Sequence, residues 1–159
     1  MSLIDFKKQS MLHNLCADYK GTWDSCKTHE DLFILATDSN SAKWMAKSYS
    51  EGWGLSKEYL KDQFYDFING KYIRDKEYTS SMYVDFKGEI KGDKLTSVII
   101  LLECDVDIVI PERFPIQIHC GGKCSIRFSG KGTAYVHKHS FDTLHVNRNE
   151  TNVKFRIYG

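Results

Sequence analysis

The sequence of 159 residues has only two prolines, Pro111 and Pro115, and no apolar run that could cross a membrane. A transmembrane helix needs about 20 apolar residues, whereas the longest apolar runs are residues 32–36 and 98–102. The first residues also lack the basic start and apolar core of a signal peptide. These absences predict a protein that is neither exported nor inserted in a membrane, and we expect it in the cytoplasm.

Cysteines are odd in number and irregularly spaced, at Cys16, Cys26, Cys104, Cys120 and Cys124. Without an export signal, this usage indicates reduced thiols and not a disulfide framework. The sequence also lacks a nucleophile elbow, a P-loop, a zinc-protease motif and a dinucleotide fingerprint. We therefore name no catalytic residue and no cofactor, and we favour a non-enzymatic protein over an enzyme.

Arginine is absent from residues 1–70, where eight Lys stand against ten Asp or Glu and give a charge of −2. Residues 121–159 carry seven Lys or Arg against two acidic residues, which gives +5. The net charge of +1 hides this difference between the two parts of the chain. The basic part predicts a surface that attracts an acidic partner.

Short apolar segments recur about every ten residues between residues 96 and 158. Within each segment apolar and polar residues alternate, as at Val106, Ile108 and Ile110, which is typical of strands buried on one side. The spacing fits a short β-solenoid with two strands in each coil of roughly twenty residues. It also fits an antiparallel β-sandwich or meander. The even spacing favours the solenoid.

In the solenoid, residues twenty apart would stack in columns. The interior columns would be Val106, Ile126 and Val146, and Ile116 and Val136 near Phe155. The outer columns would be Asp107, Arg127 and Asn147; Gln117, His137 and Arg156; and His119 and His139. Because any half-buried strand has a polar outer side, a solvated surface without a partner is the alternative.

Four short helices are predicted before the strands, over residues 3–19, 28–36, 41–51 and 56–68. Each has apolar residues at helical spacing, and Ser or Thr residues are suitable N-caps. The expected fold class is therefore α+β, with a helical head over residues 1–70 and a repetitive β tail over residues 96–159. Residues 71–95 form a transition with one strand. No long polar linker interrupts the chain, so we expect head and tail to pack as one unit.

Cationic and aromatic residues that could bind a partner gather in the β tail. These candidate binding residues are Arg127, Tyr135, His137, His139, His145, Lys154 and Arg156. Cations neutralise phosphate and aromatic rings stack on bases, so RNA or DNA binding is one hypothesis. No RNA-binding signature or reader helix accompanies them. Our leading hypothesis is a protein partner bound by the β tail as a rigid surface, and a third is an enzyme at the head–tail junction.

A metal site is the alternative use of the cysteines and histidines in the tail. The segment Cys120-Gly-Gly-Lys-Cys124 resembles a zinc knuckle, and His119 and His139 lie near it in sequence. The histidines do not have the spacing of common zinc sites. In the expected register Cys120 also faces inward, where a free thiol behaves as a small apolar group. We therefore predict no metal, with Cys120, Cys124, His119 and His139 as the alternative ligand set.

Several motifs in the first half resemble small accessory proteins, without an assigned activity, that are carried by phages and mobile elements of gut bacteria. They occupy residues 16–19, 23–27, 31–38, 52–56 and 67–70. The resemblance covers mainly residues 5–70, and it implies a small intracellular protein of phage or mobile-element origin. Modulation of a host or defence complex belongs to our leading hypothesis of a protein partner bound by the β tail. It transfers no catalytic residue. Open strand edges in the tail leave room for a homo-oligomer.

Overall fold

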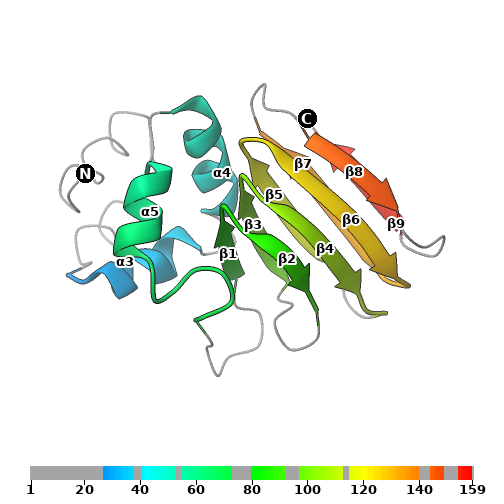
Figure 1. Ribbon diagram of the computed structural model, residues 1–159, viewed down its shortest axis with the longest axis horizontal. Coiled ribbons are helices and arrows are strands. Elements are labelled where there is room, and N and C mark those ends of the chain that lie inside the picture. Colours follow the sequence, from blue (N-terminus) through cyan, green and yellow to red (C-terminus); the bar gives the residue numbers. More distant parts are fainter. Residues whose placement is uncertain are drawn as a thin grey trace.

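The computed structural model describes residues 27–37, 41–52, 55–72, 80–91, 97–112, 115–139, 144–148 and 154–158. Within these ranges, three helices precede a set of short strands that form two sheets (Figure 1). The expected α+β class is confirmed. The helix predicted over residues 3–19 lies outside the described residues.

Two of the three described helices begin at the predicted caps, Thr28 and Ser56. Helix α3 (His29–Ala36) begins with a capping box in which Thr28 and Asp31 satisfy each other's backbone N–H groups. Helix α4 (Ala42–Glu51) ends at the left-handed Gly52. Helix α5 (Lys57–Gln63) is capped by Ser56 and stops five residues before the predicted end, in a run of turns. No described helix is long and apolar enough to span a membrane.

The strands alternate between two sheets along the chain. One sheet has the order β1 (Ser80–Val84), β3 (Val98–Leu102), β5 (Ile116–Gly121), β7 (Thr133–Lys138) and β9 (Lys154–Tyr158). The other has the order β2 (Lys87–Ile90), β4 (Asp105–Ile110), β6 (Cys124–Gly130) and β8 (Leu144–Arg148).

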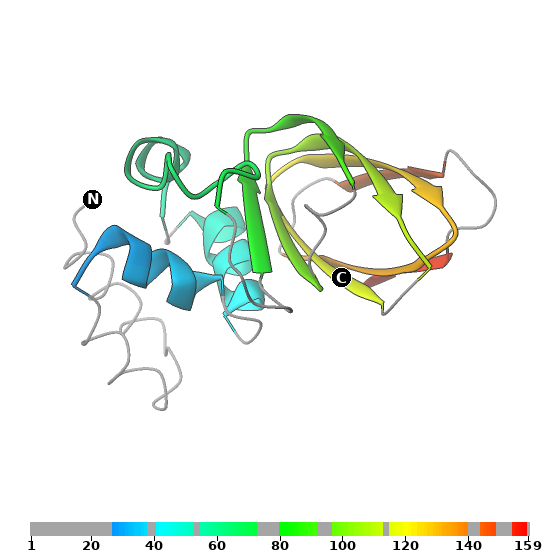
Figure 2. The ribbon, with the colours of Figure 1, turned by 90° about the horizontal axis from the view of Figure 1, so that it is seen from below.

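Every described strand pairing is parallel. Figure 2 shows the two sheets facing each other, with the chain passing from one to the other and back. An antiparallel sandwich or meander is therefore wrong, because those folds pair neighbouring strands in opposite directions. The arrangement is a solenoid-like parallel β region.

The twenty-residue register holds from β4 to β8 in the four-stranded sheet and fails in the five-stranded sheet. In the four-stranded sheet Val106 pairs with Ile126 and Ile126 with Val146, as predicted. In the five-stranded sheet Val136 pairs with Ile118, eighteen residues earlier, and not with Ile116. The cause is turn length, because residues 111–115 join β4 to β5 whereas only residues 131–132 join β6 to β7. The predicted columns that joined Ile116 to Val136, Gln117 to His137 and His119 to His139 are therefore wrong as backbone pairs.

Two hydrophobic cores meet at β3. The interior core lies between the sheets and includes Ile99 and Leu101. The second core lies between the helices and the outer side of β1 and β3, and it includes Ile100 and Leu102. Because the helices cover its outer side, β3 is buried on both faces, and this explains its continuous apolar sequence.

Candidate functional site

A cluster of polar rings lies on the outer side of the five-stranded sheet, beside α4. Helix α4 packs on β3 and β5, and the histidine residues of β5 and β7 follow next to it. We call this cluster the outer histidine surface, and it consists of Gln117, His119, Tyr135, His137 and His139. Gln117, His119, Tyr135 and His137 are half-buried on strands whose alternate residues point into the core.

The side chains of this surface hold one another in place. The Nδ1 atom of His119 lies 3.0 Å from Nε2 of His139, so one imidazole donates a hydrogen bond and the other accepts it. The ring of His119 stacks on that of His137, with centroids 4.6 Å apart. His137 Nε2 lies 2.6 Å from Oε1 of Gln117, an acceptor, so this nitrogen carries the proton. Although His119 and His139 are not backbone partners, their side chains are brought into contact as predicted.

The histidines of this surface are neutral at pH 7. Burial, followed by the charges of His137, His139 and Lys43, lowers the pKa of His119 to about 3. Burial, followed by the charges of His137, Lys43 and Lys47, lowers the pKa of His139 to about 4. The pKa of His137 is also lowered, mainly by burial. The two exposed lysines are one turn apart on α4, so an uncharged polar surface has a cationic rim.

The structure divides the predicted binding residues between the two sheets. Tyr135 and His137 lie on β7, His139 follows it, and Lys154 and Arg156 lie on β9 of the same sheet. Arg156 is the backbone partner of Tyr135. Arg127 on β6 and His145 on β8 belong to the other sheet. The seven residues therefore do not form one surface.

Arg127 is held by two carboxylates. Its Nε and Nη1 atoms lie 2.7 Å from Asp107 and 2.6 Å from Asp105, respectively. These hydrogen bonds, first to Asp107 and then to Asp105, raise the pKa of the guanidinium. The predicted pair with Asp107 is confirmed and Asp105 adds a second partner. The group as a whole is negative, which disfavours a contact between Arg127 and phosphate.

The alternative metal ligands lie on two sides of β5. Cys120 and Cys124 are buried in the interior core, whereas His119 and His139 belong to the outer histidine surface. Because neighbouring residues of a strand point to opposite sides, His119 and Cys120 do not converge on one ion. Across the described ranges, no group of three or more His, Cys, Asp or Glu residues is placed to hold a metal.

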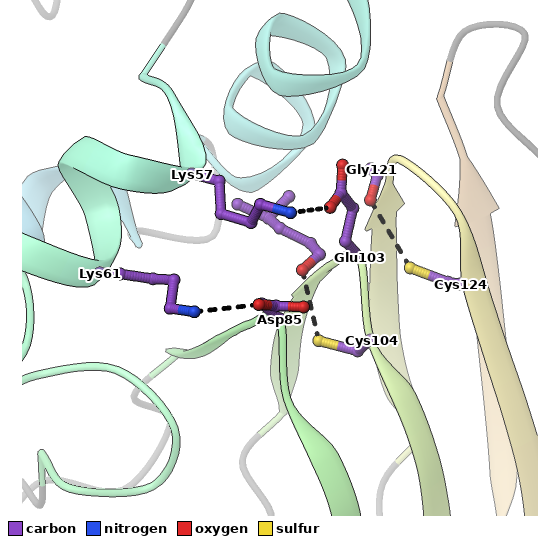
Figure 3. Close-up of polar contacts among 8 residues, drawn as sticks. Lys57, Lys61, Asp85, Glu103, Cys104, Gly121 and Cys124 are labelled. Carbon is purple, nitrogen blue, oxygen red and sulfur yellow. Dashed lines mark hydrogen bonds and ion pairs between the residues drawn. The ribbon is translucent and has the colours of Figure 1, made fainter.

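The head–tail junction is built on the corners of successive coils (Figure 3). Asp85 follows β1 and Glu103 follows β3, and both have left-handed backbones with φ of 50° and 55°. Lys61 on α5 lies 3.0 Å from Asp85, and Lys57 lies 2.9 Å from Glu103. Lys57 and Lys61 are about one helical turn apart, and one turn advances about 5.4 Å. Neighbouring strands lie about 4.8 Å apart, so the two lysines can reach the carboxylates of two consecutive corners.

Helix α4 contacts the next corner of the stack. The hydroxyl of Ser50 accepts a hydrogen bond from the backbone N–H of Gly122, at 3.0 Å. Gly121 lies so close to α4 that a Cβ atom on it would be 2.7 Å from the carbonyl oxygen of Ala46. Three successive corners are therefore fixed by helices, two through ion pairs with α5 and one through α4.

The thiols at this junction are free and buried. The Sγ atom of Cys104 donates to the carbonyl oxygen of Tyr83 at 3.3 Å, and burial raises the pKa of this thiol. The Sγ atom of Cys124 lies 3.6 Å from the carbonyl oxygen of Gly121. The hydrogen bond with Cys124, together with burial, raises the pKa of Cys120. A buried thiol with a raised pKa is a poor nucleophile, which describes Cys104 and Cys120, whereas the hydrogen bond with Cys120 lowers the pKa of Cys124.

Comparisons of the chain with known protein families, with curated proteins and with solved structures gave no match. The resemblance to phage and mobile-element proteins therefore stays a prediction. Sequence reasoning missed the corner ion pairs and the cationic rim of α4. The corners carried a weak signal, since Asp85, Glu103 and Gly122 recur at intervals of 18 and 19 residues. The cationic rim carried no signal in the sequence, because it depends on how α4 packs on β3 and β5.

Proposed function

We propose that this chain is a non-enzymatic interaction protein of phage or mobile-element type. Its solenoid-like β region would bind a protein partner through the outer histidine surface. The observation that supports this function is a group of neutral polar rings that fix one another on a rigid sheet. A component of a host or defence complex is the partner that we propose.

The rigidity of the surface favours recognition. Binding costs free energy for each side chain that loses its freedom, and a surface that is already ordered avoids much of this cost. The side chains of His119 and His139 are fixed by a hydrogen bond, and His137 is fixed by stacking and by Gln117. Covering neutral rings also costs less desolvation free energy than covering charged ones.

Affinity capture with matched variants tests this function. The wild type, a Gln117→Ala/Tyr135→Ala variant and a Ser125→Ala/Ser129→Ala control would each be immobilised and exposed to a lysate of the native host. The control changes half-buried residues on the outer side of β6. We expect one partner to be recovered with the wild type and the control, and at least about tenfold less with the variant, which would correspond to about 1.4 kcal/mol of binding. Equal recovery with all three proteins would contradict the proposal.

A nucleic acid is the second candidate partner, because Lys43 and Lys47 lie beside aromatic rings. Cations on α4 would contact phosphates while a base stacks on Tyr135 or His137. The test is salt-dependent retention of the protein on single-stranded RNA or DNA. We expect Lys43→Ala/Lys47→Ala to abolish retention and Lys87→Ala/Lys131→Ala, at exposed lysines elsewhere, to preserve it. Equal retention of the two variants would contradict this candidate. Arg127→Ala should have little effect, because two carboxylates already hold that side chain.

A further inference from the structure

Strand β9 has one strand neighbour in the described part of the chain. It ends the five-stranded sheet and pairs with β7. The backbone N–H of Lys154 donates to Gly132 on the β7 side, at 3.1 Å. Successive N–H groups of a strand point in opposite directions, so those of Phe155 and Ile157 point to the other edge. A free strand edge of this kind is a template for another strand.

An interior column also stops at β9 before it is covered. Along this column Ile99 pairs with Ile118, Ile118 with Val136, and Val136 with Ile157. The first three are fully buried, whereas Ile157 is 50% exposed. Each buried member has a rung on both sides. Among the described strands, Ile157 has a neighbour on one side, in β7. Its exposed half therefore lies where a further strand would pack.

The opposite end of the stack is closed. On the first coil, Tyr83 and Ile90 are almost completely buried. The ring of Tyr83 packs against that of Phe86, with centroids 5.2 Å apart. Stacked repeats need a cap at each end because their interior would otherwise meet water. The exposed Ile157 therefore distinguishes the β9 end from the β2 end.

The charge of β9 indicates which kind of strand would fit. Lys154 is exposed, and Arg156 follows two positions later on the same strand. A second copy would bring to this edge another strand with two cationic residues and no anionic one, and like charges facing one another across a strand pair are destabilising. An acidic strand would place carboxylates opposite Lys154 and Arg156 and an apolar side chain next to Ile157.

We propose that β9 binds an extended acidic segment of a partner protein, which adds to the sheet as one more parallel strand. The segment alternates acidic residues, which complement the cationic strand and its exposed Lys154, with apolar residues that cover Ile157. The backbone groups of Phe155 and Ile157 supply the hydrogen bonds, as in other cases of strand addition. This inference rests on the proposed function only in that the partner is a protein. It uses a different surface from the outer histidine surface.

The test is binding of a labelled synthetic peptide that alternates Glu and Val to the full chain, followed by fluorescence anisotropy. Control peptides carry Lys in place of Glu, or the same residues with the alternation scrambled. We expect the Glu–Val peptide to bind at least tenfold more tightly than either control, and this binding to weaken as salt is added. Absence of this preference in the wild type would overturn the proposal.

Two variants of β9 make the test specific. In Ile157→Pro the lost N–H is on the free edge, so pairing with β7 is retained while strand addition is blocked. We expect at least a tenfold loss of peptide binding. Lys154→Glu changes an exposed side chain and leaves β9 with one anionic and one cationic residue, so we expect the preference for the Glu–Val peptide over the Lys–Val peptide to be lost. Unchanged binding in both variants would overturn the proposal, even if the wild type binds.

Two further outcomes separate this inference from its alternatives. Sedimentation that shows a wild-type dimer, lost in Ile157→Pro, would identify the occupant as a second copy and overturn the acidic partner. Gln117→Ala/Tyr135→Ala should leave peptide binding unchanged. If the peptide does not bind but partner capture still depends on Gln117 and Tyr135, the β9 inference fails alone. If neither surface matters, the proposed function fails as well.

Discussion

The two halves of the five-stranded sheet differ in what covers their outer side. On β1 and β3 the outer residues form a core with the helices, and Ile100 is fully buried there. On β5 and β7 the outer residues are half-buried polar side chains such as His119 and Tyr135. One sheet thus has a half that the helices cover and a half whose outer side chains are partly exposed. The boundary is α4, which contacts β3 and β5.

The largest effect should come from removing apolar volume beneath the helices. We expect Ile100→Ala to lower the free energy of unfolding by about 2–5 kcal/mol, because it leaves a cavity in the core. Tyr135→Ala, on the half that the helices do not cover, should cost much less. Urea unfolding of both variants measures the difference. Similar losses in the two variants would show that both halves are covered.

A smaller loss is expected where α4 approaches β5. In Gly121→Ala the new methyl group would lie 2.7 Å from the carbonyl oxygen of Ala46 and 2.9 Å from Cδ2 of Leu102. Such overpacking typically lowers the free energy of unfolding by about 1–3 kcal/mol. Ser125→Ala, on the outer side of β6, is the matched control and should be nearly neutral in the same urea titration. A neutral Gly121→Ala would mean that α4 does not pack this closely.

The uncovered half should also respond to pH. The pKa values of His119 and His139, about 3 and about 4 in the folded chain, are below the unfolded value of about 6.5. Between these values the unfolded chain binds protons that the folded chain does not, so stability present above pH 6.5 is lost as the pH falls. We expect these histidines to account for a loss of about 1–2 kcal/mol between about pH 7 and pH 5, allowing for the partial exposure of His119.

A pair of histidine variants isolates this effect from other titrating groups. The His119→Gln/His139→Gln double variant should flatten the slope of unfolding free energy against pH. His29→Gln, which changes a histidine of α3, should keep the slope of the wild type. If the double variant and the wild type have equal slopes, the two histidines are not buried neutral groups.

The smallest effect is expected at the corner ion pairs. Lys57, Glu103, Lys61 and Asp85 are all more than a third exposed, and ion pairs of this kind contribute little. Lys57→Ala/Lys61→Ala should therefore leave the thermal unfolding midpoint close to that of the wild type, with any difference disappearing in high salt. A large drop in the midpoint would mean that α5 is fixed mainly by these two contacts.

The sequence predicts the two halves of the sheet unequally well. Alternation on β5 and β7 was correctly interpreted as burial on one side, and Ile116, Ile126 and Val136 do face the interior. The twenty-residue columns were correct in the four-stranded sheet. They failed in the five-stranded sheet because turns of unequal length make its strands pair 19, 18 and 21 residues apart from β3 to β9. Such a shift in register depends on turn geometry, which the spacing of apolar residues in the sequence does not reveal.

Part of the candidate site was also missed, because it depends on strand order and helix packing. The contact between His119 and His139 was anticipated from spacing, although their side chains meet across a diagonal of the sheet. The separation of Arg127 and His145 from the other candidates was not, because strand order decides which sheet each residue joins. The lowered pKa values of the histidines also depend on burial beside α4, and no local motif encodes that docking.

The closed first coil gives the stack a direction. Tyr83 and Ile90 are enclosed there, while successive coils towards β9 depend mainly on the coil before them. If the molecule is held by its helices and pulled at its carboxyl end, its coils should therefore unfold one at a time, beginning with the coil that contains β9. Its extension would increase by one step for each coil that unfolds, and the helices would unfold last.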